Sequence, residues 1–466
     1  MMVDSGEGGV IPRRQAENLD RRIAAGIALL VAAVGLTRVG DTSFWLDEAS
    51  SAVFVDRPLT KLVEELYKSA GMGPYYLTLW VWAHLGDSAP WLRMLSVFGG
   101  AFTAASVFLV GRRIHSRLLG GLATAALVCH PTFLRYLTEA RTYSWSMFLA
   151  AATTTTCLTL RFHPSRRAAI AFGATVGLSL ASLVFSIGVI AVQIAFLWPL
   201  TSSSRFRRHL LEAAGMATLT FTPFVPALLT SNQLNWMPAT TPARVAVQTN
   251  VFLGGTAWSA AIAVGAALML FAVIRRSPPL DPFARAGLLL CLGGAVAGPI
   301  SLIILSVRSP VFIARYLTPS LPLLMLASSA GVVATVDLVR RRVPRGAAYA
   351  TIAASLAIGF PGELFTDSAR DEQIGPPATF ITLNLKQGDS IFFEPSWLAE
   401  PFTFYLDGAW IDGEVDRTSG CRTWMIIRQS DDDDVAAAPV SSAVVIQKRE
   451  FDGYTVILTD QCPGDR

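Results

Sequence analysis

Long apolar runs separated by short polar loops occupy the first three quarters of the chain. A membrane-spanning helix needs ~20 mostly apolar residues, and by that criterion we count about eleven runs. They cover residues 23–40, 90–110, 118–135, 143–161, 168–184, 186–201, 209–228, 250–274, 284–306, 315–337 and 346–362. Each is expected to be helical, because a segment in lipid must satisfy its own backbone hydrogen bonds. The pattern therefore predicts an all-α polytopic membrane bundle.

Charge alternates between the loops that connect these runs. Every second loop is dibasic or richer, namely Arg112-Arg113, Arg166-Arg167, Arg205 to Arg208, Arg275-Arg276 and Arg340-Arg341-Arg342. Because Lys- and Arg-rich loops remain in the cytoplasm, residues 1–22 are predicted to be a cytoplasmic N-terminal segment. The odd number of spans then places the C-terminal end outside the cytoplasm.

The first outer loop, residues 41–89, is predicted to be structured. Apolar residues recur at helical spacing between Leu59 and Tyr67, which predicts an amphipathic helix lying in the interface. The stretch from Pro74 to Trp82 is apolar but too short to span, which indicates a second interfacial or protein-covered helix. A later outer loop, residues 231–250, is polar, so that it either lines a site or is a solvated loop.

Two adjacent acids, Asp47 and Glu48, stand where the chain leaves the first apolar run, beside the aromatic pair Phe44-Trp45. Ionisable groups next to lipid are costly and therefore suggest a function. The alternative is a short helix with an acidic first turn, which the helix dipole would stabilise. Successive residues of a helix point about 100° apart, so we expect Asp47 to act as a base and Glu48 to orient or cap.

From Gly362 onward the pattern becomes that of a soluble domain. Strands are predicted at 390–393 and 423–427, a helix at 397–406, and a hairpin of 444–448 and 454–458 around the turn Asp452-Gly453. Residues 363–466 are therefore predicted to form a small periplasmic α/β domain, following a transmembrane domain at 23–362. Cys421 and Cys462 flank the strand region in an oxidising compartment, which makes them a candidate disulfide.

Composition agrees with a membrane protein. The chain is 52% hydrophobic and 15% charged, with a mean hydropathy of +0.47, whereas soluble domains carry about 25% charged residues. The net charge of +4 and the lack of a Lys/Arg tract argue against a nucleic-acid partner. The five cysteines include no CxxC pair, so a thiolate metal site is not expected.

Further charged and aromatic residues fall on the outer side in this topology. They are Arg93 at the start of the second span, Glu139, Arg141 and Tyr143 after the third, and Arg315 and Tyr316 before the tenth. An arginine at a helix end usually extends to the interface, but here several separate hairpins contribute to one face. Arginines bind phosphate through bidentate hydrogen bonds, and an acid can act as general base to a hydroxyl. The set suits group transfer from a lipid phosphate.

Five motifs occur in a characteristic order. They are Trp45-x-Asp47-Glu48-Ala49, Pro74-Tyr75-Tyr76, Leu92-Arg93-x-x-Ser96, Glu139-Ala140-Arg141-x-Tyr143 and Arg315-Tyr316-x-x-Pro319. The set resembles the GT-C glycosyltransferases that depend on polyprenyl phosphate, specifically bacterial relatives of protein O-mannosyltransferases and of lipid A aminoarabinose transferases. The chain departs from that pattern at Gly71-Met72-Gly73-Pro74, where relatives often have His-Pro-Pro or an acid.

The resemblance implies a multi-pass protein of the bacterial plasma (inner) membrane with an extracytoplasmic active site. Its donor would be a mannose- or arabinose-like sugar on polyprenyl phosphate. Its acceptor would be a hydroxyl of a glycan, lipid or protein, and the protein would also contact membrane lipid. Carried over by motif, Asp47 and Glu48 are catalytic and Arg93, Arg141 and Arg315 bind the donor phosphate. Glu139, Tyr143, Tyr316, Tyr75 and Tyr76 contact substrate.

A divalent cation is a further implication, since some members of this class bind one. Oxygen ligands from Asp47, Glu48 and Glu139 would suit it.

Two other classes of protein stay open: a transporter for a lipid or sugar, and a catalytically silent membrane assembly protein. Transporters tend to show paired half-repeats with broken helices near the bilayer midplane, and the sequence shows no such symmetry.

Overall fold

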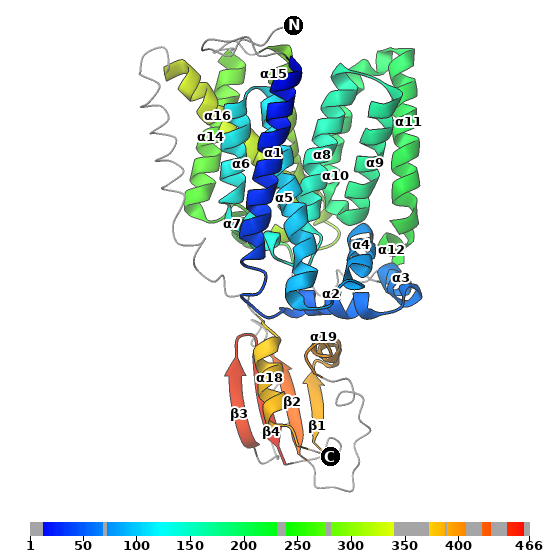
Figure 1. Cartoon of the computed structure of the whole chain (residues 1–466), viewed down its shortest axis with the longest axis vertical. Helices are drawn as coiled ribbons and strands as arrows, with labels where there is room; N and C mark the ends of the chain where they lie inside the picture. Colours follow the sequence, from blue (N-terminus) through cyan, green and yellow to red (C-terminus); the bar gives the residue numbers. More distant parts are fainter. Residues whose placement is uncertain are drawn as a thin grey trace. The chain divides into compact units, whose positions relative to one another are not determined.

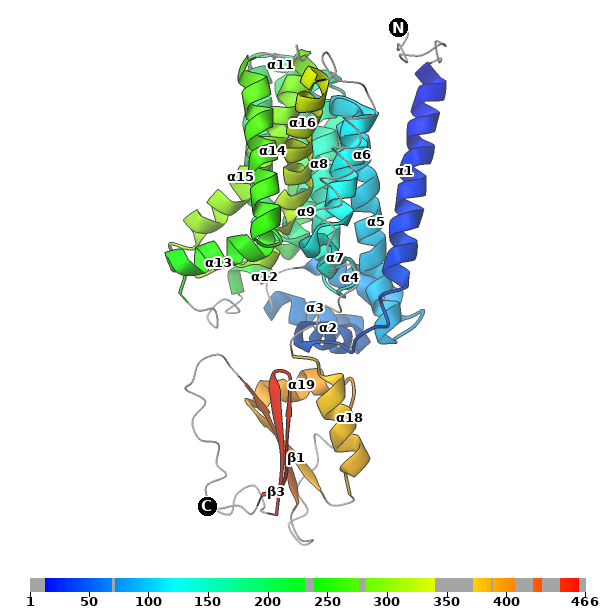
Figure 2. The same cartoon turned by 90° about the vertical axis from the view of Figure 1, so that its left-hand side faces the viewer.

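The computed structural model describes residues 13–68, 72–230, 239–275, 281–339, 372–386, 389–406, 422–429 and 445–460. Two compact units make up the chain (Figures 1 and 2). The first comprises Met1–Arg38, Val63–Thr78 and Arg93–Thr366, and the second Val39–Leu62, Leu79–Leu92 and Asp367–Arg466. Each unit is described by itself.

All regular elements among the described residues of the first unit are helices. Its elements are α1 (Arg13–Leu36), most of α5 (Ala89–Ile114), α6 (Arg117–Val128), α7 (Pro131–Leu137), α8 (Tyr143–Phe162), α9 (Arg166–Ser182), η1 (Val184–Ser186), α10 (Ile187–Leu197), η2 (Trp198–Ser202), α11 (Ser204–Phe221), η3 (Thr222–Phe224), α12 (Val225–Thr230), α13 (Pro242–Phe252), α14 (Thr256–Arg275), α15 (Pro282–Leu305), η4 (Ala314–Ser320) and α16 (Leu321–Val339). Helices α3 (Leu59–Lys68) and α4 (Gly73–Ala83) contribute residues to both units.

Helices occupy every predicted span except 346–362, which lies outside the described residues. Within the described part of the chain, five helices are long and apolar enough to cross a membrane: α5, α14, α15, the η1–α10–η2 segment and the η4–α16 segment. Helices α6 and α7 add a sixth if they are one span bent by 69°. The other helices are shorter or more polar, as α9 with 17 residues illustrates. The count of eleven therefore stays a prediction.

Small residues allow the helices of the first unit to approach closely. A Cβ on Gly173 of α9 would lie 2.1 Å from the carbonyl oxygen of Ala213 in α11, and a Cβ on Gly331 of α16 would lie 1.9 Å from that of Gly265 in α14. Contacts of this kind replace hydrophobic burial as the packing force in lipid, where neighbouring acyl chains are as apolar as leucine. Helix α13 differs in direction, lying across the ends of α14 and α15 (Figure 2).

The second unit combines part of the first outer loop with the C-terminal tail. Its described elements are α2 (Leu46–Asp56), α18 (Gly375–Asn384), β1 (Ser390–Glu394), η5 (Ser396–Leu398), α19 (Ala399–Phe402), β2 (Thr423–Arg428), β3 (Val445–Phe451) and β4 (Tyr454–Thr459). The sheet order is β1-β2-β4-β3, with β1 parallel to β2 and the other pairs antiparallel. The central strands are buried, and Trp424 and Tyr454 are fully so.

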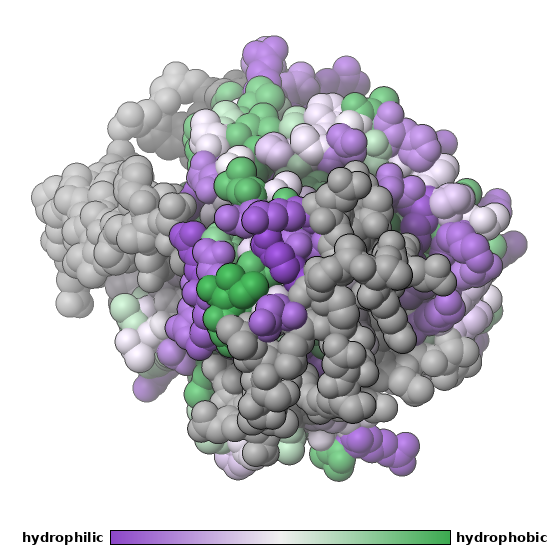
Figure 3. Space-filling view, turned by 90° about the horizontal axis from the view of Figure 1, so that it is seen from below, coloured by the Kyte–Doolittle hydropathy of each residue, from purple (hydrophilic) through white to green (hydrophobic). Residues whose placement is uncertain are grey.

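Most of the predicted tail elements form. The β3–β4 hairpin turns at Asp452-Gly453, where Gly453 adopts the left-handed φ of +80° that glycine tolerates. The predicted helix 397–406 is shorter, ending at Phe402. Hydrophilic side chains cover much of the described surface seen in Figure 3, interrupted by small apolar patches. The candidate disulfide of Cys421 and Cys462 lies outside the described residues.

Candidate functional site

The first cluster in the helical unit joins three of the predicted motifs. Arg141 Nη1 donates a hydrogen bond of 2.8 Å to Tyr76 Oη. Tyr75 Oη lies 3.0 Å from Ser96 Oγ, which donates to the Arg141 carbonyl oxygen at 3.1 Å. Both tyrosines and Ser96 are buried. Side chains from α4 and α5 thus hold the turn between α7 and α8, and the sequence singled out Ser96 only as part of a motif.

Arg93 belongs to the same part of α5. It is 1% exposed and lies three residues before Ser96, which places the two on one helix face. A buried guanidinium costs several kcal/mol of desolvation free energy unless it is paired. Arginine is the side chain that proteins favour both for buried ion pairs and for phosphate recognition.

A second cluster surrounds Tyr136 of α7. Its ring lies 4.7 Å from that of Tyr143, and its phenol interacts electrostatically with Glu139 and Arg315. Glu139 is 1% exposed and forms an ion pair of 3.9 Å with Arg135. Tyr136 thus has contacts or electrostatic interactions with Glu139, Tyr143 and Arg315, and its central position among them was not predicted.

Tyr316 and its short helix η4 are fixed by neighbouring helices. The Tyr316 ring stacks on Phe185 with centroids 4.3 Å apart, and Thr318 Oγ1 lies 3.1 Å from Ser146 Oγ of α8. At the start of η4, Ala314 N donates to Gln248 Oε1 at 2.9 Å. Gln248 thereby holds the residue before Arg315.

Gln248 lies on α13, within the polar stretch 231–250. From the sequence this stretch either lines a site or is a solvated loop. The helix begins at Pro242 behind the cap Thr241, whose hydroxyl accepts from Arg244 N. A cap followed by proline is a helix start signal that identifies this helix in the sequence. Gln248 itself has no such local signal, because its partner is 66 residues away.

Residues at the bend between α6 and α7 are hydrogen-bonded to the C-terminal end of α13. Fully buried His130 contacts the Leu253 carbonyl oxygen through Nε2 at 3.2 Å. Thr132 Oγ1 donates to the carbonyl oxygen of Phe252 at 2.8 Å. Because these carbonyls lie at the end of α13, the α6–α7 bend and the helix that carries Gln248 are linked by hydrogen bonds.

The backbone of Met72 and Gly73, within the motif that departs from the expected pattern, is closely constrained. A Cβ on Gly73 would lie 2.3 Å from the Phe224 ring. Met72 before it has a φ of +64°, which L-residues rarely adopt. A side chain at position 73 would therefore require the Phe224 ring to shift, and α4 begins directly at this glycine.

Asp47 and Glu48 belong to the second unit. They occupy the first turn of α2, behind Trp45 as N-cap, so the acidic first turn expected of a short helix is present. Glu48 is fully buried and Asp47 half-buried. This difference agrees with separate tasks for the two acids.

Asp47 lies within electrostatic reach of the sheet. Burial raises the pKa of the Tyr454 phenol, and the neighbouring Glu372 carboxylate raises it further. Arg428 acts in the opposite direction, and Asp47 makes a smaller contribution that also raises this pKa. The candidate base and the tail are therefore electrostatic neighbours.

The described residues contain no group of three or more His, Cys, Asp or Glu side chains that could hold a metal ion. Glu139, one of the expected ligands, forms an ion pair with Arg135. No catalytic step is assigned to a cation here.

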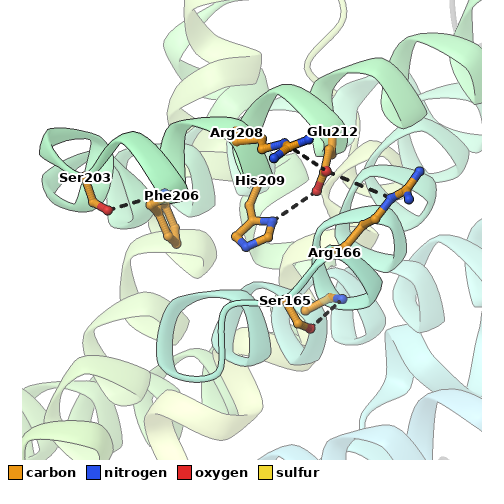
Figure 4. A network of polar contacts seen from close by, with 8 residues as sticks. Ser165, Arg166, Ser203, Phe206, Arg208, His209 and Glu212 are labelled. Atoms are coloured by element: carbon orange, nitrogen blue, oxygen red, sulfur yellow. Dashed lines mark hydrogen bonds and ion pairs between the residues drawn. The ribbon is translucent and has the colours of Figure 1, made fainter.

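A separate polar network joins α9 to α11 (Figure 4). Glu212 lies 3.0 Å from His209 Nδ1, 3.9 Å from Arg166 and 4.0 Å from Arg208. Ser165 and Ser203 cap the two helices by accepting from Ala168 N and Phe206 N. Arg166 and Arg208 come from two of the loops predicted to be cytoplasmic, whereas His209 and Glu212 fall at the start of the predicted span 209–228, and the network fastens the two helices together.

No protein-family profile and no curated protein matches this sequence. Solved structures do match. ArnT from Cupriavidus metallidurans bound to undecaprenyl phosphate has a TM-score of 0.57 at 15% identity, over 94% of this chain and 97% of that one. The apo state of ArnT gives 0.57 at 14% identity, over 95% and 98%.

The Archaeoglobus fulgidus oligosaccharyltransferase also matches, with a TM-score of 0.52 at 11% identity in its apo form. That match covers 78% of this chain and 58% of the enzyme, so the chain spans only part of its length. The complex of that enzyme with Zn and sulfate gives 0.51 at 13% identity. The chain therefore has the fold of GT-C glycosyltransferases, which confirms the predicted resemblance at the level of the fold.

Proposed function

We propose that this chain is an integral membrane glycosyltransferase that transfers a sugar from a polyprenyl-phosphate donor to an acceptor hydroxyl. The observation that carries the proposal is the buried cluster of Tyr75, Tyr76, Ser96 and Arg141 in a fold shared with ArnT. Polar side chains from several helices gather there around an arginine, although burial of such groups is costly.

The reaction divides between two groups of residues. Arg93, Arg141 and Arg315 bind the donor phosphate and stabilise its charge as it leaves. Asp47 accepts the proton of the acceptor hydroxyl, whose oxygen bonds to the anomeric carbon of the sugar. The bond between that carbon and the phosphate oxygen breaks, and polyprenyl phosphate leaves with the electron pair.

The remaining predicted residues orient the reactants. Glu48 orients or caps the start of α2, as its full burial supports. Glu139, Tyr143, Tyr316, Tyr75 and Tyr76 contact donor or acceptor through hydroxyl, carboxylate and ring faces.

The finer predictions belong to the same proposal. The chain would cross the bacterial inner membrane about eleven times, with residues 1–22 in the cytoplasm and the tail domain 363–466 outside. Its sugar would be mannose- or arabinose-like, and its acceptor a glycan, a lipid or a protein. A requirement for a divalent cation is tested by chelation, which is expected to leave the transfer rate unchanged.

The test compares Asp47→Asn with Asp56→Asn, which alters an exposed acid at the other end of the same helix. Membrane vesicles receive a lipid extract from a strain that lacks this chain, as the source of accumulated donor. We expect Asp47→Asn to abolish transfer while the protein still binds undecaprenyl phosphate, because the carboxylate acts only in the chemical step. Asp56→Asn should transfer at the wild-type rate.

Other outcomes identify the other classes. Near-normal transfer by Asp47→Asn removes Asp47 as the base. Movement of the lipid across the bilayer without transfer by the wild type would indicate a transporter. An unchanged lipid and glycan profile in the deletion strain would indicate a silent assembly protein.

A further inference from the structure

The chain just before α2 is paired with the tail. Trp45 and Gln373 form an antiparallel bridge, and Ile374 N donates to the Phe44 carbonyl oxygen at 2.9 Å. Ser43 Oγ donates to Gln373 Oε1 at 3.1 Å and accepts from Gly375 N at 3.3 Å. These contacts fix the backbone that leads into the turn carrying Asp47.

A tail side chain also binds the other backbone group of Phe44. Phe44 N donates to Tyr405 Oη at 2.7 Å across 361 residues of sequence. The Phe44 side chain is fully buried, and its ring lies 4.9 Å from that of Phe404. The entry to α2 is therefore held by both its backbone and its side chain.

The far end of α2 is attached to the tail as well. Arg57, the C-cap residue, forms an ion pair with Glu400 of α19, and α19 packs against α2. The Arg57 carbonyl oxygen accepts from Trp80 Nε1 at 3.0 Å. Both ends of α2 are therefore in contact with the tail.

The surroundings of Asp47 are themselves cross-linked. Arg428 binds Glu372 Oε1 through Nη2 at 2.7 Å and Nε at 3.1 Å. Tyr454 Oη donates to the Glu372 carbonyl oxygen at 3.3 Å. Residue 372 precedes the bridge partner of Trp45, so the strand ends and the α2 entry form one connected network.

We propose that the tail is a positioning domain for the candidate base, with Tyr405, Arg57 and Glu400 as positioning residues. The inference rests on the proposed function, since it assumes that Asp47 takes the acceptor proton. A base must lie within about 2.6–3.2 Å of the group it deprotonates. A displacement of ~1 Å can cost about 100-fold in rate. A short helix such as α2 reaches that precision only if it is held by something rigid, which the four-stranded sheet of the same unit supplies.

The test measures kcat and donor affinity separately in four variants of the full chain: Tyr405→Phe, Arg57→Glu, Glu400→Arg and the double variant Arg57→Glu/Glu400→Arg. We expect kcat to fall ~10- to 100-fold in each single variant, with undecaprenyl phosphate binding unchanged. The double variant should recover most of the loss, because it restores the ion pair with the charges exchanged. Lys448→Glu, on exposed strand β3, should leave kcat unchanged.

Amide hydrogen exchange at residues 44–50 gives a readout independent of activity. In Tyr405→Phe the Phe44 amide loses its acceptor, and exchange there should accelerate. Wild-type kcat in the single variants would overturn the inference, as would a loss that the charge exchange does not recover. If Asp47→Asn is inactive while the single variants keep the wild-type kcat, the proposed function is supported and the positioning role is contradicted. If Asp47→Asn is active, both fall.

Discussion

Arg141 donates a 2.8 Å hydrogen bond to the phenol of Tyr76, a residue 65 positions earlier in the chain. Both residues come from motifs that the sequence singled out separately, and Ser96 connects them to α5 through the Arg141 carbonyl oxygen. The contact with Tyr76 fixes the direction of the Arg141 guanidinium. Preorganisation of this kind lowers the entropic cost of binding a phosphate.

Arg141→Ala should weaken binding of undecaprenyl phosphate about 10- to 100-fold, because hydrogen bonds to charged groups contribute ~1.5–3 kcal/mol. Tyr76→Phe leaves the charge and removes only the preset direction, so its effect should be below ~10-fold. Binding to vesicles with and without undecaprenyl phosphate measures both. Arg166→Ala, in the network between α9 and α11, serves as the control. Equal affinity of Arg141→Ala and wild type would contradict a phosphate-binding role.

Gln248 is expected to act through Arg315. Gln248→Leu removes the acceptor of Ala314 N and should weaken donor binding ~3- to 10-fold, the effect of one neutral hydrogen bond. Gln248→Glu keeps an acceptor oxygen and should bind like wild type. The control Asn250→Ala changes an exposed residue on the same helix. If Gln248→Glu loses as much affinity as Gln248→Leu, the hydrogen bond is not what matters.

The predicted topology is tested with reporters. A reporter fused after Arg466 should be active outside the cytoplasm, and one fused after Ser204 should be active inside it, because the arginine-rich start of α11 is retained in the cytoplasm. Activity of the Arg466 fusion in the cytoplasm would mean that the span count is wrong by an odd number.

The tail should lose stability in strong alkali. The pKa of Tyr454 is raised above its value in the unfolded chain, mainly by burial. Its neutral phenol therefore contributes stability that is fully present below pH ~10 and is lost as the pH rises further. Thermal unfolding of the wild-type protein between neutral and alkaline pH should show this decline. In Tyr454→Phe the slope should be shallower, and an identical slope would exclude Tyr454 as its source.

Local features of the structure were predictable from the sequence. The apolar runs, the amphipathic helix α3 and the Asp452-Gly453 hairpin depend on the residue period or on the φ of a single residue. Their side-chain burial follows: Leu62 and Leu66 are buried while Lys61 and Glu64 are exposed. The ordered motifs predicted the fold that ArnT shares.

Tertiary structure alone decided which residues meet. Tyr405 binds Phe44 across 361 residues, and Gln248 binds Ala314 across 66, with no periodic signal for either pair. It also grouped the Asp47 helix with the tail, whereas the sequence pattern assigned residues 41–89 to the domain 23–362. The physical reason is that a pattern of apolar and polar residues fixes which face of an element is buried, whereas the partner of that face is selected by packing between whole elements.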